Sequence, residues 1–259
     1  MIGVIAGDVI GSVHEHGMRK STDFPLFDPL CRFTDDTVLT VATAYAILTA
    51  TSYETAYRDF GRAYPDAGYG GAFYDWLLAD EPRPYNSWGN GSAMRVAPVG
   101  FAFDNVDDVL REAERSAAVT HNHAEGIKGA QATALAVFMA RSGASKDEIR
   151  ANLAQRFAYD LNRTVTQIRP DYQWDVSCPG SVPEAIVAFL DSSNVEDAIR
   201  LAVSLGGDAD TQAAIAGGIA EAFYRRVPAA IVSTVRERLP LRFIEVIDVF
   251  RQAFPLEER

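Results

Sequence analysis

The chain has 259 residues, of which 48% are hydrophobic and 23% charged, and its formal net charge is -11. This composition is typical of a globular protein. The acidic charge argues against bulk binding of nucleic acid, because few cations could replace the counterions of a phosphate backbone, but it does not exclude a small ligand that contains a nucleotide. No apolar run approaches the roughly 20 residues needed to cross a bilayer, so we expect no membrane partner.

Residues 1–13 are apolar, but they lack a basic region and are interrupted by Asp8. We therefore expect neither a signal peptide nor a membrane anchor. The two cysteines, Cys31 and Cys178, are interpreted as thiols in a reducing compartment. These features predict a cytoplasmic protein, which we expect to be a monomer.

Helical patterns then follow one another along the chain. Residues 36–49 are apolar almost all round, which is typical of a helix buried on most faces. Residues 124–141 are rich in alanine and are followed by Gly143, a typical helix end. Ser145 and Glu148 predict a capping box before a helix that reaches about Phe157. The other predicted helices span 181–190 (opened by Ser181, Pro183 and Glu184), 195–205 (after Asn194), 211–224, 228–238 and 241–253.

Strand patterns are scarce. The best candidate, 163–168, is short and weak. The stretches 65–71 and 80–98 are rich in Gly and Pro and are predicted to be loops long enough to be functional. Small residues along 211–224 would let another helix approach closely. The sequence therefore predicts an all-α protein in which residues 1–259 form a single compact domain.

Two short segments, 34–37 and 206–211, each place two carboxylates and a hydroxyl directly before a long apolar helix. Either segment alone could be an ordinary helix start, with Thr34 or Asp208 as the N-cap and the following acids favoured by the helix dipole. That explanation accounts less easily for two such segments that both lead into buried helices. Buried carboxylates need a countercharge, and neither segment contains a basic residue.

Hard divalent cations would supply that charge. Mg²⁺, Mn²⁺ and Ca²⁺ bind oxygen ligands, and the two segments could hold two such ions if the fold brings them together. Zinc is disfavoured, because the four histidines and two cysteines have no zinc-like spacing. The candidate metal ligands are Thr34, Asp35, Asp36, Asp208, Asp210 and Thr211.

A third candidate is the segment GNGSAMR, residues 89–95. Its two glycines would let backbone N–H groups approach a phosphate closely, although the segment by itself is more typical of a surface turn. Arg95 could pair with a phosphate or tie the loop to an acid elsewhere. Residues 121–123, His-Asn-His, are interpreted as exposed loop residues when they are considered alone.

Two acids near the N-terminus complete the set of candidates. Asp8 is interpreted as a structural, hydrogen-bonding acid in preference to a metal ligand. Glu15 lies near an expected turn at Gly11, and its role stays open until another feature places it in a site.

In chain order the motifs are GDVIGSVHE (7–15), FTDDT (33–37), GNGSAMR (89–95), THNHAEG (120–126), VPEAI (182–186) and GGDADT (206–211). Over residues 3 to about 225 this series resembles the ADP-ribosylglycohydrolase family, which includes the bacterial dinitrogenase reductase-activating glycohydrolases and the animal ADP-ribosyl-acceptor hydrolases. TDDT and GGDADT are highly specific as a pair, whereas GNGSAMR is specific only in their company. The resemblance implies a multi-helix bundle with a central binuclear site that usually holds Mg²⁺ or Mn²⁺.

The resemblance also implies roles for individual residues. Glu15 matches the acid on the family's N-terminal flap, which lies over the site and helps to position or deprotonate the attacking water. Asp36 and Asp210 match metal ligands that could also handle protons, so the implied catalytic residues are these two and Glu15. The residues that match the diphosphate loop and the contacts to phosphate and ribose are Gly89, Asn90, Gly91, Ser92, Met94, Asn122 and His123.

The implied reaction is hydrolysis of the glycosidic bond at C1″ of the distal ribose, which releases ADP-ribose from an ADP-ribosylated acceptor. The acceptor could be arginine, serine, a nucleic-acid end or a free small molecule, and the short segment between Glu15 and Thr34 leaves a long acceptor-recognising flap in doubt. Two other functions stay open. One is a non-catalytic ADP-ribose-binding module, and the other is a different nucleotide-directed metallohydrolase that would cleave a pyrophosphate to give AMP.

Overall fold

The computed structural model describes residues 1–256, and every regular element in that range is a helix. The β-type contact found there is an isolated antiparallel bridge between Gly89 and Ser177. The prediction of an all-α protein is therefore confirmed. In chain order the helices are α1 (Ile2–Gly11), α2 (Asp35–Thr49), α3 (Tyr53–Ala63), α4 (Gly71–Leu78), α5 (Gly91–Met94), α6 (Ala97–Ala102), α7 (Val106–Ala118), α8 (Ala124–Ser142), α9 (Lys146–Phe157), α10 (Val165–Ile168), α11 (Cys178–Asp191), α12 (Val195–Val203), α13 (Ala209–Tyr224), α14 (Ala229–Arg236) and α15 (Leu241–Ala253).

Helix ends follow the sequence signals where these are strong. Ser145 and Glu148 form the predicted capping box at the start of α9, and the Asn194 side chain caps α12. Gly143 ends α8 in the left-handed conformation, with φ of 93°. Each of these caps satisfies backbone groups that the end of a helix leaves unpaired.

Two predicted elements differ from the structure. The strand predicted at 163–168 is wrong: Val165–Ile168 is the short helix α10, which begins with a capping box between Thr164 and Gln167. The helix predicted from Ser181 begins earlier, at Cys178, because the Ser177 side chain accepts a hydrogen bond from the backbone N–H of Gly180. In both cases a local cap, which satisfies the first free N–H groups, decided the outcome.

Several helices lie where none was predicted. Helices α1, α3, α4 and α7 fall in stretches that were left unassigned or assigned to loops, and the predicted loop 80–98 contains α5 and the start of α6. The expected turn at Gly11 is the last residue of α1. Helix α1 is buried along its whole length, so periodicity alone gives a weak signal for it. Helices α3 and α7 each bury residues at i, i+3, i+4, i+7 and i+8, a helical periodicity that was overlooked.

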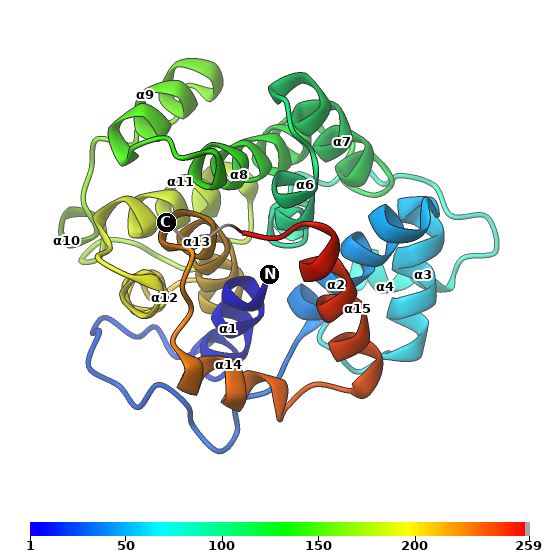
Figure 1. Ribbon diagram of the computed structural model, residues 1–259, viewed down its shortest axis with the longest axis horizontal. Coiled ribbons are helices and arrows are strands. Elements are labelled where there is room, and N and C mark those ends of the chain that lie inside the picture. Colours follow the sequence, from blue (N-terminus) through cyan, green and yellow to red (C-terminus); the bar gives the residue numbers. More distant parts are fainter. Residues whose placement is uncertain (257–259) are drawn as a thin grey trace.

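Helix α1 packs against α13 through a row of glycines (Figure 1). Gly3, Gly7 and Gly11 lie four residues apart and therefore share one face of α1. A Cβ atom at Gly7 would lie 2.1 Å from the carbonyl oxygen of Ala213, and one at Gly3 would lie 2.3 Å from the carbonyl oxygen of Gly217. The two backbones are thus too close for any side chain between them. The predicted close approach to the small residues of 211–224 is confirmed, with α1 as the partner.

The two helices run in opposite directions. Gly3 faces Gly217 and Glu221, in the second half of α13, whereas a Cβ atom at Gly11 would lie 2.4 Å from Cα of Asp210, near its start. The C-terminal end of α1 and the residues that follow it are therefore brought beside the first turn of α13. This packing positions the N-terminal acids against the second acidic segment.

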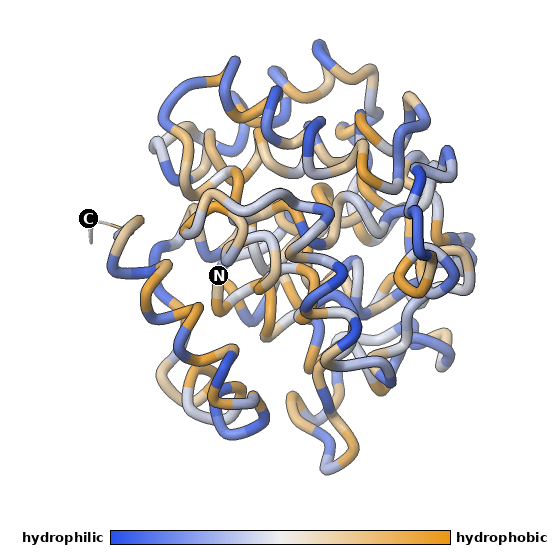
Figure 2. The backbone as a smooth tube through the Cα atoms, turned by 90° about the vertical axis from the view of Figure 1, so that its right-hand side faces the viewer, coloured by the Kyte–Doolittle hydropathy of each residue, from blue (hydrophilic) through white to orange (hydrophobic). Residues whose placement is uncertain are grey.

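Helix α13 lies at the centre of the molecule, with α1, α8, α11 and α12 packed around it (Figure 1). Residues from Ala209 to Ala222 on α13 are buried. Helix α15, at the periphery, has one buried face, which consists of Phe243, Ile247 and Phe250. In Figure 2 this helix leads to the label C, and hydrophilic and hydrophobic residues alternate along it. Among the described helices, none combines the length and apolarity that crossing a membrane requires.

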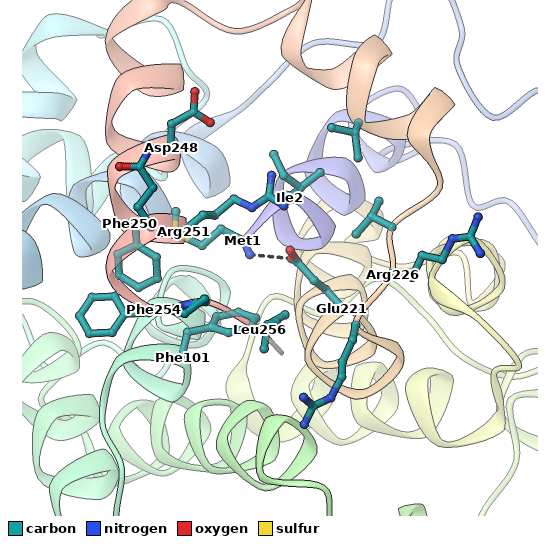
Figure 3. A pocket seen from close by; sticks show the side chains of 15 residues that line it. Met1, Ile2, Phe101, Glu221, Arg226, Asp248, Phe250, Arg251, Phe254 and Leu256 are labelled. Atoms are coloured by element: carbon teal, nitrogen blue, oxygen red, sulfur yellow. Dashed lines mark ion pairs between the residues drawn. The ribbon is translucent and has the colours of Figure 1, made fainter. Parts of the chain in front are cut away.

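A cavity of about 520 Å³ lies near the end of α13 (Figure 3). The N-terminal ammonium of Met1 and the carboxylate of Glu221 form an ion pair of 2.6 Å at its wall. Asp210 precedes Glu221 on the same helix by about three turns, or roughly 16 Å at 1.5 Å per residue. The cavity is therefore separate from the acidic segments.

Candidate metal centre

Asp8, near the end of α1, holds the start of α2. Its buried carboxylate accepts hydrogen bonds from the backbone N–H groups of Thr34 and Thr37, at 2.9 and 3.1 Å, and from both threonine hydroxyls. The Thr34 hydroxyl in turn accepts from the backbone N–H of Asp36, so Thr34 is the N-cap of α2. These bonds agree with the interpretation of Asp8 as a structural acid, and they fix α2 to α1.

The two acidic segments meet at this point. Carboxylate oxygens of Asp8, Asp36 and Asp210 all lie within 4.8 Å of one another, and so do those of Glu15, Asp208 and Asp210. The Thr211 hydroxyl lies 3.4 Å from Oδ2 of Asp36, which joins the second segment to the first. Asp210 belongs to both groups, so the structure contains two adjoining sets of three acids.

Asp35 takes a different position from the other predicted ligands. It is the first residue of α2, its side chain is half-buried, and its carboxylate belongs to neither group of three. Its backbone N–H donates to the carbonyl of Ala67 at 2.9 Å. A Cβ atom at Gly68 would lie 3.8 Å from Asp35 Oδ1, so the loop before α4 covers this carboxylate.

Burial and mutual repulsion raise the pKa values of these acids. Burial raises the pKa of Asp8 to about 6, against the lowering effect of its threonine hydrogen bonds. The pKa of Asp35 is raised to about 8, first by burial and then by the charges of Asp8 and Asp208. Burial is also the first cause for Asp36 and Asp210, whose pKa values lie well above the ordinary range. These carboxylates are crowded together with little access to water, and both conditions disfavour their charged forms.

The donor set fits hard divalent cations. No salt bridge to a basic side chain is found for Asp36, Asp208 or Asp210 in the described part of the chain. Oδ1 of Asp36 is buried and has no hydrogen-bond partner among the described residues. A buried carboxylate oxygen without a partner is costly, and carboxylate and hydroxyl oxygens are the ligands that Mg²⁺, Mn²⁺ and Ca²⁺ prefer.

The Gly89–Met94 segment lies directly beside the acids. Nδ2 of Asn90 donates to Oδ2 of Asp208 at 2.7 Å and to the Ser181 hydroxyl at 3.2 Å. The Ser92 hydroxyl donates to the carbonyl of Gly126 at 2.7 Å. The Met94 sulfur accepts from the Thr211 hydroxyl at 3.7 Å. The segment is therefore connected to the second acidic segment and is not a free surface turn.

The three residues before α8 have different environments. Nδ1 of His123 accepts a hydrogen bond from the backbone N–H of Glu125 and so caps α8. The His123 ring lies edge-on to the ring of the exposed Trp88, with 5.3 Å between the ring centroids. Oδ1 of Asn122 accepts from the backbone N–H of Asn86. The expectation of an exposed His121 is wrong: this ring is buried behind Gly91, and burial lowers its pKa well below the usual value.

Neither alternative for Arg95 is correct. Its side chain is fully buried and lies over the ring of Tyr57 at 4.3 Å. Nη2 donates to the carbonyl of Ser116 at 3.0 Å and to the Thr120 hydroxyl at 2.8 Å. Arg95 thus fastens α5 to the end of α7, where no phosphate can reach it without displacing the core.

The sequence indicated only a structural role for Asp8 and no role for Tyr69. Asp8 is a member of one group of three acids as well as a hydrogen-bonding residue; its place in a glycine-spaced helix was the available signal. The buried hydroxyl of Tyr69 has no hydrogen-bond partner among the described residues, and its pKa is raised by burial and by the charge of Asp35. Nothing local in the sequence distinguishes Tyr69 from other aromatic loop residues.

Comparison with known proteins agrees with this geometry. The ADP-ribosylglycohydrolase family model matches residues 1–256. The chain is similar to the ADP-ribosylhydrolase ARH3 of Mus musculus, with 28% identity over an alignment that is 305 residues long. The alignment covers 86% of this chain and 82% of the relative. It is also 30% identical over 142 residues to the ADP-ribosylarginine hydrolase Tri1 of Pseudomonas putida, a match that covers 52% of this chain and 38% of that protein.

A solved structure described as an ADP-ribosylglycohydrolase-related protein complex has the same fold. It superposes with a TM-score of 0.74 and 27% sequence identity, and the match covers 97% of this chain and 95% of the other. The family match extends over all the described residues and includes every motif that suggested the resemblance. The chain therefore belongs to the ADP-ribosylglycohydrolase family.

Proposed function

We propose that the protein hydrolyses the glycosidic bond between ADP-ribose and an acceptor, with two divalent cations, Mg²⁺ or Mn²⁺, in its site. The observation that carries this proposal is the meeting of two groups of three acids that share Asp210. They lie beside a glycine-rich segment that is tied to Asp208 through Asn90. Acids that could hold metal ions, in contact with a glycine-rich backbone segment, suit a substrate that offers ribose hydroxyls and a diphosphate.

The six predicted ligands, together with Asp8, are the residues that would hold the ions. Bound there, the cations would orient the ribose hydroxyls and lower the pKa of a water molecule. Asp36 and Asp210 would contribute ligand oxygens from α2 and α13. Asp8 keeps the Thr34 and Thr37 end of α2 in position through its four hydrogen bonds.

Glu15 is the residue proposed to take the proton of the attacking water. It follows α1, it is half-buried, and its pKa is raised by burial and by the charge of Asp208. A raised pKa brings a carboxylate closer to the operating pH of a general base. In this reaction the water oxygen bonds to C1″ as its proton passes to Glu15, the bond from C1″ to the acceptor breaks, and the acceptor leaves with a proton. The surrounding negative charge stabilises the oxocarbenium-like transition state.

The substrate's diphosphate is proposed to lie against the backbone of Gly89 to Met94. His123 and Asn122 flank this segment from the start of α8, with Trp88 beside them. His121 supports the turn from behind, since a Cβ atom at Gly91 would lie 3.0 Å from its Nε2. The loop thus has little freedom to move inward, which favours a preformed phosphate site.

Product analysis is the experiment that tests the proposal. The protein is incubated with arginine-linked and serine-linked ADP-ribosyl peptides and with Mg²⁺ or Mn²⁺, and the products are identified by mass. We expect intact ADP-ribose and unmodified peptide from at least one substrate, with no release after EDTA treatment and recovery with Mg²⁺ or Mn²⁺ but not with Zn²⁺. AMP as the product would favour the pyrophosphate-cleaving alternative, and binding without release would favour a non-catalytic module.

The stability of the metal-free protein is expected to fall as pH rises. The folded-state pKa values of Asp8 and Asp35, about 6 and about 8, lie above the ordinary value of 3.8. Between the ordinary value of 3.8 and the raised values, the folded state therefore binds more protons than the unfolded state. The free energy of unfolding consequently decreases as pH rises toward 8. Thermal unfolding in EDTA should show a decreasing midpoint between about pH 5 and pH 8, and Mg²⁺ or Mn²⁺ should raise the midpoint most at the alkaline end.

Asp35→Asn is the matched control for that measurement. It removes the carboxylate whose pKa is raised to about 8, so the alkaline part of the decrease should become shallower. A midpoint in EDTA that does not change with pH, or that no divalent cation raises, would contradict the crowded-acid interpretation.

Gly91→Val is expected to weaken ADP-ribose binding by about 10–100-fold, as the loss of one hydrogen bond to a charged phosphate would do. The new side chain meets the His121 ring at the back of the loop, so the backbone must shift toward the space proposed for the phosphates. Calorimetric titration with ADP-ribose measures the effect, and titration with Mn²⁺ is the control, which should stay within about twofold because no acid is changed. Unaltered ADP-ribose affinity would remove this loop from the proposed site.

A further inference from the structure

The segment that carries Glu15 is the connection between α1 and α2, residues 12–33, which we call the Glu15 loop. It forms the long blue excursion at the edge of the molecule in Figure 1. One end is fixed because α1 packs against α13. With the loop against the body of the protein, a carboxylate oxygen of Glu15 lies within 4.8 Å of carboxylate oxygens of Asp208 and Asp210. The contacts that hold it there are therefore important for the site.

Lys20 joins this loop to the segment that precedes the second acidic cluster. Its Nζ donates to the carbonyl of Tyr172 at 2.6 Å and to the carbonyl of Leu205 at 2.5 Å. Lys20 follows Glu15 by five residues, and Leu205 precedes Asp208 by three. A single ammonium group thus joins the segment that carries Glu15 to the segment that carries the second acidic cluster. Hydrogen bonds from a charged donor are among the strong ones in proteins.

The two carbonyls that Lys20 binds belong to rigid parts of the structure. The Tyr172 hydroxyl donates to the carbonyl of Gly180 and accepts from Nε2 of Gln212, both at 2.8 Å, which fixes this segment to α11 and α13. Leu205 is buried and leads into Gly206, whose φ is +71°. The Lys20 ammonium therefore binds to a fixed frame.

The loop backbone also rests directly on the turn before α13. A Cβ atom at Gly206 would lie 2.8 Å from the carbonyl oxygen of Arg19 and 3.0 Å from Cε of Lys20. A second attachment lies farther along the loop, where Nη1 of Arg200 donates to the carbonyls of Thr22 and Phe24 at 3.1 and 2.7 Å. Between Glu15 and that second attachment, Lys20 supplies the bonds to the frame of the site.

We propose that Lys20 is a positioning residue, which fastens the Glu15 loop to the carbonyls of Tyr172 and Leu205 and so holds the Glu15 carboxylate beside Asp208 and Asp210. The catalytic consequence rests on the proposed function of Glu15, whereas the fastening itself does not. Lys20 touches neither the reacting atoms nor the proposed phosphate loop. Its effect on turnover passes through Glu15.

Arg19 is a natural control for Lys20. It is the neighbouring cation on the same loop, but its Nη1 donates to the carbonyl of Asp23, within the loop itself, at 3.1 Å. Its guanidinium also lies over the ring of Phe24, at 5.3 Å, which is another contact inside the loop. Arg19→Met therefore removes a positive charge from the loop without releasing the loop from the frame, whereas Lys20→Met removes the charge and the attachment together.

Hydrogen–deuterium exchange on the whole protein, without substrate, tests the fastening independently of activity. We expect amides of residues 12–33 to exchange about tenfold faster in Lys20→Met, because a charged pair of hydrogen bonds is lost. Arg19→Met should exchange like the unaltered protein, and Lys20→Arg should restore most of the protection because a guanidinium can also donate to two carbonyls. Equal exchange in Lys20→Met and the unaltered protein would overturn the proposal.

A double-mutant cycle with Glu15→Gln tests the consequence for turnover. Lys20→Met should lower kcat by about tenfold while the affinity for Mn²⁺ changes by less than about twofold, and it should lower kcat no further when Glu15 is already Gln. An equal loss in both backgrounds would show that Lys20 acts on the structure in general and would overturn the positioning role. If Glu15→Gln itself turns over normally, the proposed base is wrong, and the exchange measurement still decides whether Lys20 fastens the loop.

Discussion

Asp36→Asn and Asp210→Asn are each expected to reduce turnover by about 10³-fold or more, as happens when groups that organise charge in a transition state are removed. Asp36 and Asp210 belong to the same group of three acids, and Asp210 also belongs to the other. An amide keeps the size of the side chain but removes the charge that would attract a divalent cation. Both variants should therefore lose metal affinity along with turnover.

The same substitutions should stabilise the metal-free protein. Oδ1 of Asp36 is buried without a hydrogen-bond partner in the described structure, and the pKa values of Asp36 and Asp210 are raised by burial and by neighbouring acids. Replacing either carboxylate with an amide removes this repulsion. A variant that is more stable in EDTA and nearly inactive with Mn²⁺ is the pattern of a functional residue held at a cost to stability.

Steady-state release of ADP-ribose and thermal unfolding in EDTA are the two measurements. Asp104→Asn is the matched control, because Asp104 is exposed and pairs with Arg141 at the surface, where an ion pair contributes little. That control should leave both quantities nearly unchanged. Turnover like that of the unaltered protein in Asp36→Asn or Asp210→Asn would refute the proposed metal-dependent mechanism.

Gly7→Ala is expected to lower the free energy of unfolding by about 2 kcal/mol or more, although alanine is the better helix former. The added Cβ atom would lie 2.1 Å from the carbonyl oxygen of Ala213. The Cβ atom is fixed by the backbone of α1, and the carbonyl oxygen belongs to the backbone of α13. No rotamer change can relieve such a contact, so α1 must move away from α13. For a protein of this size the thermal midpoint should fall by about 4–8 °C.

Gly71→Ala separates the clash from the change in helix propensity. Gly71 is the first residue of α4, and nothing lies within 4 Å of a Cβ atom added there. This variant should be as stable as the unaltered protein or slightly more stable. Thermal and urea-induced unfolding of the two variants measure the difference. A Gly7→Ala protein with an unchanged midpoint would contradict the close packing of α1 on α13.

Local signals in the sequence determined much of the helical framework. The capping box of Ser145 and Glu148 and the glycine end at Gly143 were predictable because the hydrogen bonds that they make join residues only a few positions apart. The all-α class followed from such segments. The same kind of local bond explains the error at 163–168, where the capping box of Thr164 and Gln167 was overlooked. The single domain over residues 1–259 stays a prediction.

The candidate ligands were suggested by two acidic segments, but only the tertiary structure brought these together. Asp36 and Asp210 are far apart in sequence, and their approach depends on α1, whose glycines let it pack on α13 while Asp8 holds the start of α2. Glycine ordinarily weakens a helix, so the row of glycines in α1 acquires its meaning only from the helix opposite. The individual roles of the site residues stay predictions.

Burial was likewise decided by packing. His121 and Arg95 are polar residues at the ends of motifs, and nothing in their neighbours distinguishes a buried side chain from an exposed one. Arg95 is buried because it packs against Tyr57 of α3, Ser116 of α7 and Thr120 in the turn that follows α7. Hydrogen bonds between near neighbours are encoded within a few residues, whereas burial and the meeting of distant acids depend on which helix faces pack together, and this the sequence specifies only through the whole fold.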